Sequence, residues 1–155
     1  MQALDTRQYN AITHSKSPIF TMTTEKTILL PVDREPVIRV IPMPRDSNAS
    51  GDVFGGWIMA QVDLAGSVPA TAHAKGRIVT VAVNEFIFKQ PVFVGDLCSF
   101  YAEVVKVGRT SMQVYVEVFA QRRLKPDDVA KVTEAYITYV AVDENRNSRP
   151  VDPLR

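Results

Sequence analysis

The hydrophobic positions along the chain follow two different periods, one typical of a buried helix and the other of β-strands. Apolar side chains at residues 55–74 cover most of the circumference of a predicted helix, which indicates a helix that is buried nearly all round. Pro69 lies inside this segment, and because proline has no N–H donor we expect it to kink the helix or end its regular part early. The residues AKGR at 74–77 then supply the glycine and basic side chains expected at a helix C-terminus.

The remaining apolar segments are rich in β-branched and aromatic residues and predict strands. Residues 111–121 show the clearest alternation, with apolar side chains at every second position, as expected for a strand with one buried face. The predicted strands are Pro36–Met43, Ile78–Phe88, Leu97–Val107, Ser111–Gln121 and Ala130–Val142.

The predicted element order is therefore a strand, a helix and four further strands joined by short links. Short links favour antiparallel neighbours. Because no other element is available to cover the buried helix, the sheet has to wrap around it. We therefore expect an α+β fold in which a long central helix is wrapped by a curved antiparallel sheet of about five strands.

Composition excludes several classes of protein. The 155 residues carry a formal net charge of +1, so there is no overall basic footprint for nucleic acid. No apolar run approaches the roughly 20 residues of a membrane span, and the first residues lack the apolar core of a secretory signal. We therefore expect a cytoplasmic protein with no nucleic-acid or membrane partner. It would form a single domain over residues 28–155 behind a flexible N-terminal tail at 1–27.

Cysteine and histidine are too scarce for most metal sites. The single cysteine, Cys98, excludes an intrachain disulfide and a multi-cysteine metal centre, and its strand context indicates a core residue. The two histidines, His14 and His73, are far apart in the sequence, and a surface or helix-end position is expected for them. We therefore expect no metal.

The stretch NASGDVFGGWIMAQVDLAG, residues 48–66, combines acidic side chains with glycines at the start of the apolar helix. A helix N-terminus presents unpaired N–H groups and a partial positive charge, which suit a carbonyl oxygen that becomes negative during acyl transfer. Gly55 and Gly56 permit close approach of a ligand to this backbone. Asp52, just upstream, is placed to act as a general base or a nucleophile.

A second acid, Asp63, lies inside the predicted helix. Eleven helical residues would separate it from Asp52 by roughly 16 Å, so a second subunit is the natural source of one carboxylate if the two act together. Two non-catalytic interpretations stay open at this point. Aspartate is a favoured helix cap, which would explain Asp52, and Asp63 would then be a solvated acid at a gap in the apolar face.

These residues resemble the hotdog-fold acyl-CoA thioesterases. The stretch at 48–66, followed by GRIVTVAVNEFIFKQPVFVGD and VGRTSMQVYVEV, is most similar to YciA-type acyl-CoA hydrolases and also similar to the domains of mammalian brain acyl-CoA hydrolase. The resemblance covers roughly residues 37–142. Many members have HGG where this chain has FGG at Phe54, and the YciA-type subgroup shares the phenylalanine.

The resemblance implies a hotdog fold, dimers in which two sheets join edge to edge, and assembly of three such dimers into a hexamer. It implies active sites at the dimer interface that hydrolyse acyl-CoA to a free acid and CoA, with no cofactor besides the CoA of the substrate. Asp52 matches the aspartate that YciA-type enzymes use as base or nucleophile. Asp63 matches a helix acid that other hotdog thioesterases take from the partner subunit, and Asn48 matches an asparagine that orients substrate or water. The N–H of Gly56, with Gly55, would polarise the thioester carbonyl.

CoA carries phosphates, so cations are expected near the mouth of the groove. Arg109 occupies the matching GRTS turn and is the preferred candidate, although any single arginine is more often a solvated loop residue. The other candidates for contacts with CoA are Arg77, Thr80, Gly108, Ser111 and the pair Arg122–Arg123.

Two other functions compete with hydrolysis. A non-hydrolytic acyl-CoA binding or regulatory module on the same fold would also bind the thioester, although the presence of both Asp52 and Asp63 argues against it. A dehydratase acting on acyl-carrier protein usually pairs an acid with a catalytic histidine, and residues 48–66 contain no histidine.

Overall fold

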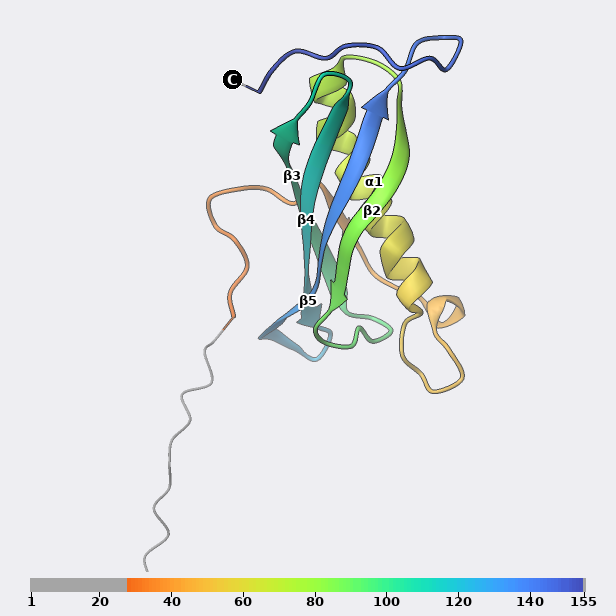
Figure 1. Ribbon diagram of the computed structural model, residues 1–155. Helices are drawn as coiled ribbons and strands as arrows, with labels where there is room; N and C mark the ends of the chain where they lie inside the picture. Colours follow the sequence, from red (N-terminus) through yellow and green to blue (C-terminus); the bar gives the residue numbers. More distant parts are fainter. Residues whose placement is uncertain (1–27, 155) are drawn as a thin grey trace, which may run out of the picture.

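The computed structural model describes residues 28–154, so the predicted tail at 1–27 lies outside the described residues. One helix lies against one face of a five-stranded antiparallel sheet (Figure 1), which confirms the predicted α+β architecture. The elements are β1 (Ile38–Val40), the 3-10 turn η1 (Pro44–Asp46), α1 (Gly55–Ala74), β2 (Ile78–Phe88), β3 (Leu97–Val107), β4 (Ser111–Arg122) and β5 (Lys125–Ala141).

The strand order in the sheet is β1-β3-β4-β5-β2. Strands β3, β4 and β5 form an antiparallel meander, whereas β2 pairs with β5, with Phe88 opposite Thr133 and Ile78 opposite Ala141. The expectation that short links join neighbouring strands is therefore wrong for β2 and β3. Residues 89–96 instead pass across one end of the sheet, because β4 and β5 lie between the two strands they connect.

Most predicted boundaries agree with the structure, and the exceptions have local causes. The helix continues through Pro69 to Ala74, so of the two expectations for this proline the early end is wrong, and the kink stays a prediction. The residue after the helix that adopts the left-handed conformation is Lys75, with φ of 52°, rather than a glycine. Strand β5 begins at Lys125 instead of Ala130, because its pairing with β4 continues to the end of the hairpin.

The hydrophobic core lies between α1 and the sheet. Its helix side is made of Ile58, Val62, Ala65, Ala70 and Ala74. On the sheet side, the alternation predicted for β4 is confirmed, since Met112, Val114, Val116 and Val118 are all fully buried. Cys98 in β3 is also fully buried, as expected.

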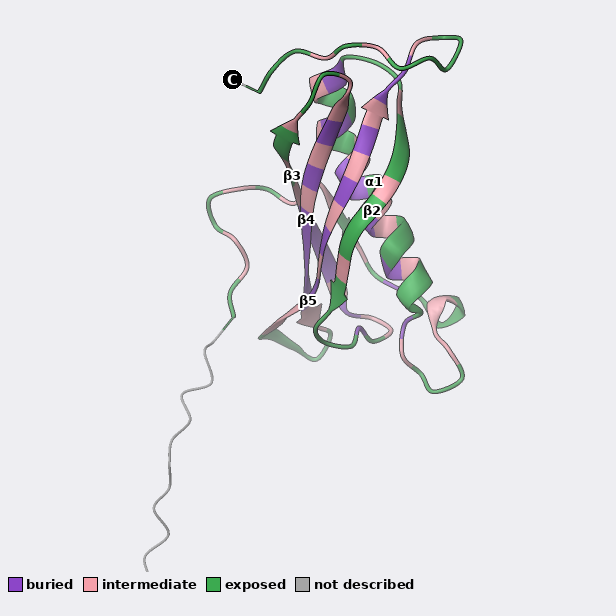
Figure 2. Cartoon of the chain, viewed as in Figure 1, coloured by how far each residue is buried: buried purple, intermediate pink, exposed green. Residues whose placement is uncertain are grey.

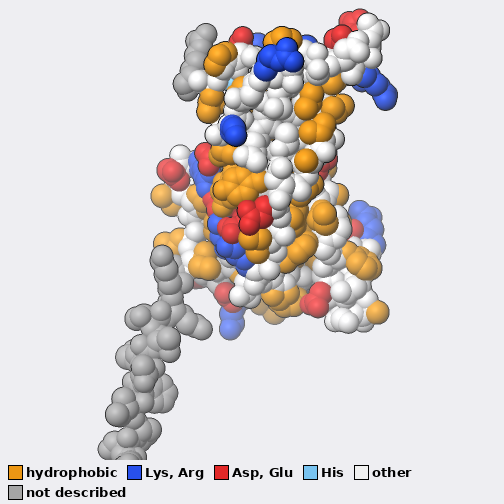
Figure 3. Space-filling view, in the orientation of Figure 1, with side chains coloured by type: hydrophobic (Ala, Val, Ile, Leu, Met, Phe, Trp, Pro, Cys, Tyr) orange, Lys and Arg blue, Asp and Glu red, His pale blue; other side chains and the backbone are white. Residues whose placement is uncertain are grey.

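Apolar side chains on the outer side of α1 and along β2 remain exposed (Figure 2). Leu64 and Val68 are each about half exposed, at 53% and 51%, so the helix is not buried all round within a single chain. Strand β2 forms an edge of the sheet and exposes Val81 and Val83 at 54% and 48%, and hydrophobic side chains are visible along it in Figure 3. No helix within residues 28–154 has the length and apolar character needed to cross a membrane.

Candidate active site

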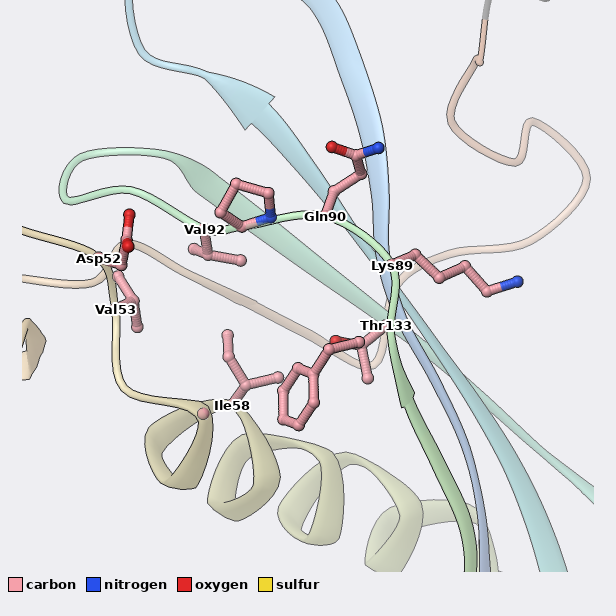
Figure 4. A pocket seen from close by; sticks show the side chains of 10 residues that line it. Asp52, Val53, Ile58, Lys89, Gln90, Val92 and Thr133 are labelled. Carbon is pink, nitrogen blue, oxygen red and sulfur yellow. The ribbon is translucent and has the colours of Figure 1, made fainter.

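A pocket of about 400 Å³ lies where α1 begins and β2 ends (Figure 4). Asp52 is the carboxylate in its wall, and most of the other lining side chains are apolar. The lining residues are Asp52, Val53, Gly55, Ile58, Phe88, Lys89, Gln90, Pro91, Val92 and Thr133. The structure thus brings Asp52 and the first helical residue, Gly55, to one cavity.

The turn that carries Asp52 is organised by Asn48. The Asn48 side-chain oxygen accepts hydrogen bonds from the backbone N–H of Ser50 at 2.9 Å and of Asp52 at 3.2 Å. The backbone N–H of Asn48 also donates to the carbonyl oxygen of Asp52 at 2.7 Å. Gly51 has a φ of 90°, a conformation that favours glycine, so the tight turn needs this residue. Asn48 therefore positions Asp52 through the backbone.

The same turn is attached to the link between β2 and β3. The N–H of Val53 donates to the carbonyl oxygen of Val92 at 3.0 Å, and Asp52 forms an isolated antiparallel bridge with Phe93. Because Val53 and Val92 both line the pocket, these backbone contacts join two of its walls.

Arg122 holds the far part of this link in place. Its guanidinium donates to the carbonyl oxygen of Pro91 at 3.1 Å, forms an ion pair with the buried Asp96, and lies 4.8 Å from the centre of the Phe93 ring. These intrachain contacts occupy Arg122, which gives no support to its candidacy as a CoA-phosphate ligand. The neighbouring Arg123 is exposed.

The helix N-terminus is uncapped by any side chain. The N-cap residue is Phe54, without a side-chain hydrogen bond, so the interpretation of Asp52 as the helix cap is wrong. The backbone N–H groups of Gly55 and Gly56 donate to no acceptor within residues 28–154. A Cβ atom at Gly56 would meet nothing within 4 Å, whereas one at Gly55 would lie 3.2 Å from the ring of Phe88. Packing within the chain therefore does not require a glycine at 56.

Asp63 is half-buried and hydrogen-bonded, so it is not a simple solvated acid. Its Oδ1 accepts from the hydroxyl of Thr80 at 2.8 Å and from the hydroxyl of Tyr139 at 3.2 Å. Burial, with the nearby Asp63 carboxylate, raises the pKa of Tyr139 well above its ordinary value, so the phenol stays protonated and remains a donor. Asp63 does not line the Asp52 pocket of its own chain.

Lys89 contributes its side-chain stem to the pocket, while its ammonium group points away from it (Figure 4). The ammonium lies 2.7 Å from Oε1 of Glu134, and the ammonium of Lys131 lies 3.0 Å from Oε2 of the same carboxylate. These hydrogen bonds, from Lys89 first and then from Lys131, lower the pKa of the Glu134 carboxyl. The cluster forms a charged area on the outer face of the sheet over β4 and β5 (Figure 3).

Four of the CoA-contact candidates, Arg77, Gly108, Arg109 and Ser111, lie at the opposite end of the sheet. Arg77 directly precedes β2, while Gly108 and Arg109 form the turn between β3 and β4 that leads into Ser111. Eight residues of β5 separate the Thr133 end from the Ala141 end, a distance of about 26 Å at roughly 3.3 Å per residue. A single chain therefore does not bring these residues to Asp52.

Some of these candidates border a smaller pocket of about 170 Å³. It is lined by Lys106, Gly108, Ser111, Gln113 and Thr138. Arg77 and Arg109 are exposed and do not line it. His73 lies in the last turn of α1, where its Nε2 is 2.8 Å from the carbonyl oxygen of Asp152, which confirms the expected helix-end position. Within residues 28–154, no three His, Cys, Asp or Glu side chains are grouped to hold a metal.

Sequence reasoning missed the residues that line the Asp52 pocket from the link after β2 and from β5. The segment KQPVFVGD provides Lys89, Gln90, Pro91 and Val92. In the sequence this segment follows the predicted strand Ile78–Phe88, so it indicated only where that strand ends. Thr133 lies within a predicted strand, and its place in the pocket depends on the non-consecutive pairing of β2 with β5.

Comparison with known proteins agrees with this fold. The family model described as "Thioesterase superfamily" matches residues 50–126. An uncharacterized acyl-CoA thioester hydrolase of Zymomonas mobilis is 46% identical over 120 residues, which cover 77% of this chain and 80% of that protein. The acyl-CoA thioester hydrolase YciA of Escherichia coli is 42% identical over 116 residues, which cover 73% of this chain and 87% of that protein. A hexameric hotdog fold thioesterase of Campylobacter jejuni has a TM-score of 0.73 at 42% identity, covering 77% of this chain and 91% of that one.

A five-stranded antiparallel sheet packed on one long helix is thus the fold of a hotdog thioesterase. The chain belongs to the thioesterase superfamily, among the relatives named acyl-CoA thioester hydrolases that include YciA. The resemblance drawn from residues 48–66 and the segments after them is confirmed.

Proposed function

We propose that this protein hydrolyses acyl-CoA thioesters to a free carboxylic acid and CoA, with Asp52 as the reacting carboxylate. The observation that carries the proposal is the grouping of Asp52, the unpaired N–H groups at the start of α1 and an apolar pocket in one place. A base, an oxyanion site and a space for an acyl chain are the parts that thioester hydrolysis needs. The names of the relatives support the same activity.

In the proposed reaction, the N–H groups of Gly56 and Gly55 donate to the thioester carbonyl oxygen and stabilise the negative charge that develops on it. Asp52 either removes a proton from the attacking water or attacks the carbonyl carbon itself, forming an anhydride that water then cleaves. The C–S bond breaks, the sulfur leaves as thiolate and takes up a proton, and the acid is released. Asn48 keeps Asp52 in position through the turn described above.

We further propose that the active unit is a dimer joined through the β2 edges. An antiparallel β2–β2 pairing about a two-fold axis places the start of one β2 beside the end of the other. The partner subunit's Arg77 and the partner subunit's Thr80 would then approach the Asp52 pocket, together with the partner subunit's Asp63. The exposed valines of β2 and the exposed outer side of α1 support this interface.

We propose that three such dimers associate into a hexamer. The Campylobacter jejuni thioesterase, which resembles this chain over 91% of its own length, is hexameric. Gly108, Arg109 and Ser111, which lie far from Asp52 within one chain, are proposed to contact CoA in the assembled protein.

Release of CoA thiol, followed with Ellman's reagent, tests the proposal. Wild type, Asp52→Ala, Asp52→Asn and the control Asp128→Ala would be compared on short, medium and long acyl-CoA esters. Asp128 is exposed near the start of β5 and does not line the Asp52 pocket, so its removal should leave turnover unchanged. We expect loss of Asp52 to lower kcat by about 10²–10⁴-fold without changing the oligomer.

Two outcomes would overturn the proposal. A folded wild type that binds CoA esters but hydrolyses none of them would favour the binding module. Near-normal turnover by Asp52→Ala would transfer the catalytic role to another group, with Asp63→Ala as the next variant. A single turnover in ¹⁸O-labelled water, followed by mass analysis of Asp52, distinguishes attack by the carboxylate from activation of water.

A further inference from the structure

Two buried side-chain oxygens have no hydrogen-bond partner within residues 28–154, namely Ser99 Oγ and Thr133 Oγ1. An unpaired buried hydroxyl is unfavourable, so each case needs an explanation. Both residues are fully buried, but only Thr133 lines the Asp52 pocket. Ser99 lies in β3, outside the pocket.

The backbone around Thr133 is irregular in a way that affects the pocket. Val118 of β4 pairs with Thr133, but the next residue, Phe119, pairs with Lys131, so Val132 is an extra residue in β5. Such a bulge redirects side chains and is common beside active sites. It leaves the consecutive residues Val132 and Thr133 both fully buried, whereas a regular strand would turn them to opposite faces.

The bulge is also hydrogen-bonded to the link after β2, which forms another wall of the pocket. The carbonyl oxygen of Val132 accepts a hydrogen bond from the N–H of Lys89 at 2.9 Å, at the start of the link that lines the pocket. Thr133 lies opposite Phe88, the last residue of β2. The bulge therefore places the Thr133 side chain and the Lys89–Val92 wall around the same space.

Thr133 and Asp52 lie at opposite sides of this space. Figure 4 shows Thr133 on the side of the pocket away from Asp52, with Ile58 and Val92 between them in the view. If the thioester carbonyl lies beside Asp52, an acyl chain that enters the pocket extends past apolar side chains toward Thr133. Phe88 is paired with Thr133 in the sheet and also lines the pocket, so its ring borders the space that such a chain would occupy.

We propose that Thr133 determines acyl-chain specificity, its hydroxyl forming a hydrogen bond with a polar substituent on the acyl chain. The preferred substrates are then acyl-CoA esters whose short chain carries a hydroxyl or keto oxygen, ahead of plain alkyl chains of the same length. A plain chain leaves the Thr133 hydroxyl unpaired, whereas a substituted chain satisfies it. This inference rests on the proposed thioesterase function and adds the substrate class to it.

The test compares kcat/KM for butyryl-CoA, 2-hydroxybutyryl-CoA, 3-hydroxybutyryl-CoA and acetoacetyl-CoA. Four proteins are used: wild type, Thr133→Val, Thr133→Ser and Ser99→Ala. Valine keeps the shape of threonine without the hydroxyl, and serine keeps the hydroxyl. Ser99→Ala removes the other unpaired buried hydroxyl, away from the pocket, and is the matched control.

We expect wild type to favour at least one oxygen-bearing ester over butyryl-CoA. Thr133→Val should lower that preference by about 10-fold, chiefly by slowing the substituted ester, the size expected for one hydrogen bond. Thr133→Ser and Ser99→Ala should keep the wild-type preference. Thr133→Val should also unfold at no lower urea concentration than wild type, because it loses an unpaired group.

The inference is overturned if active wild type and Thr133→Val show the same ratios, or if Ser99→Ala shifts them equally. In both cases hydrolysis continues and the proposed thioesterase function stands. Absence of hydrolysis of any ester by folded wild type overturns the thioesterase function itself, and this inference with it.

Discussion

The hydroxyl of Tyr139 donates to the backbone carbonyl oxygen of Asp63 at 2.8 Å and lies 3.2 Å from Oδ1 of the same residue. This contact joins the middle of α1 to β5, across the buried side of the helix. Gly66 makes the approach possible, because a Cβ atom there would lie 2.5 Å from the Tyr139 oxygen. The position of the Asp63 carboxylate, which the proposed dimer would bring to the partner subunit's site, depends on this tyrosine.

Tyr139→Phe should therefore destabilise the protein. The substitution removes the donor to both Asp63 oxygens, and we expect the free energy of unfolding to fall by about 1 kcal/mol. Urea denaturation followed by circular dichroism measures the change. Thr80→Val removes the other donor to Oδ1 at an exposed position and serves as the control with a smaller effect. An unchanged midpoint for Tyr139→Phe would show that this contact contributes nothing.

The two glycines at the start of α1 should respond differently to alanine. At Gly56 the space beside the backbone is open, so Gly56→Ala should fold at least as stably as wild type, since alanine favours helix. A methyl group there would displace the thioester from the free N–H groups, and turnover should fall on the order of 10²-fold.

Gly55→Ala is the matched control for that experiment. Its methyl group would lie 3.2 Å from the Phe88 ring, so we expect lower stability together with altered turnover. If Gly56→Ala retained full activity, the N-terminus of α1 would not be the oxyanion site. Thermal unfolding and thiol release on the same preparations separate the two effects.

A charge on the β2 edge should break the dimer. Val81→Lys places an ammonium group at a position that is 54% exposed in one chain and buried in the proposed interface. We expect dissociation to monomers in analytical ultracentrifugation and loss of turnover, because the site needs the partner. Leu124→Lys, at an 88% exposed position in the β4–β5 turn, should leave assembly intact. An active, fully assembled Val81→Lys protein would place the interface elsewhere.

Cys98 should be unreactive in the folded protein. The thiol is fully buried, and burial, followed by the charge of the nearby Asp96, raises its pKa from 9.0 to about 12. Ellman's reagent should detect no protein thiol in the native state and one per chain after denaturation. A rapid native reaction would contradict the burial of Cys98.

The same thiol makes stability depend on alkaline pH. Its pKa is higher in the folded state, so above pH 9 the unfolded thiol ionises while the folded one keeps its proton. Stability is therefore fully present below pH 9 and declines as the pH rises from 9 toward 12, by up to about 1.4 kcal/mol per pH unit from this group. Tyr139 acts in the same direction, so Cys98→Ala, which should flatten the decline, isolates the contribution of the thiol.

Local patterns predicted the elements well, because the helix and strand periods are set by neighbouring residues. The bounds of α1, β2 and β3 agree with the prediction to the residue. The pairing of β2 with β5 was missed, since it joins segments far apart in sequence and depends on how the sheet closes on the helix. The helix does not end at Pro69, because packing against the sheet outweighs the loss of one helical hydrogen bond.

For the site, too, local sequence predicted the residues that are neighbours in the chain and missed those that the fold brings together. Asp52 and Gly55 belong to one short stretch, and the chemistry of a helix N-terminus was enough to associate them. Thr133 and Val92 reach the pocket only through the fold. Likewise, Arg77 and Arg109 are separated from Asp52 by the length of the sheet, a distance that no local pattern reports.

The position of β2 at the sheet edge has a consequence for how the protein is made. Strand β5, with which β2 pairs, leaves the ribosome after the other described strands, whereas β3, β4 and β5 can pair in order as they emerge. The apolar side chains of α1 and β2 therefore stay uncovered until β5 has been made. The pocket walls meet only at that final closure, so a truncated chain lacking β5 would retain Asp52 and have neither a finished pocket nor a supported edge for a partner.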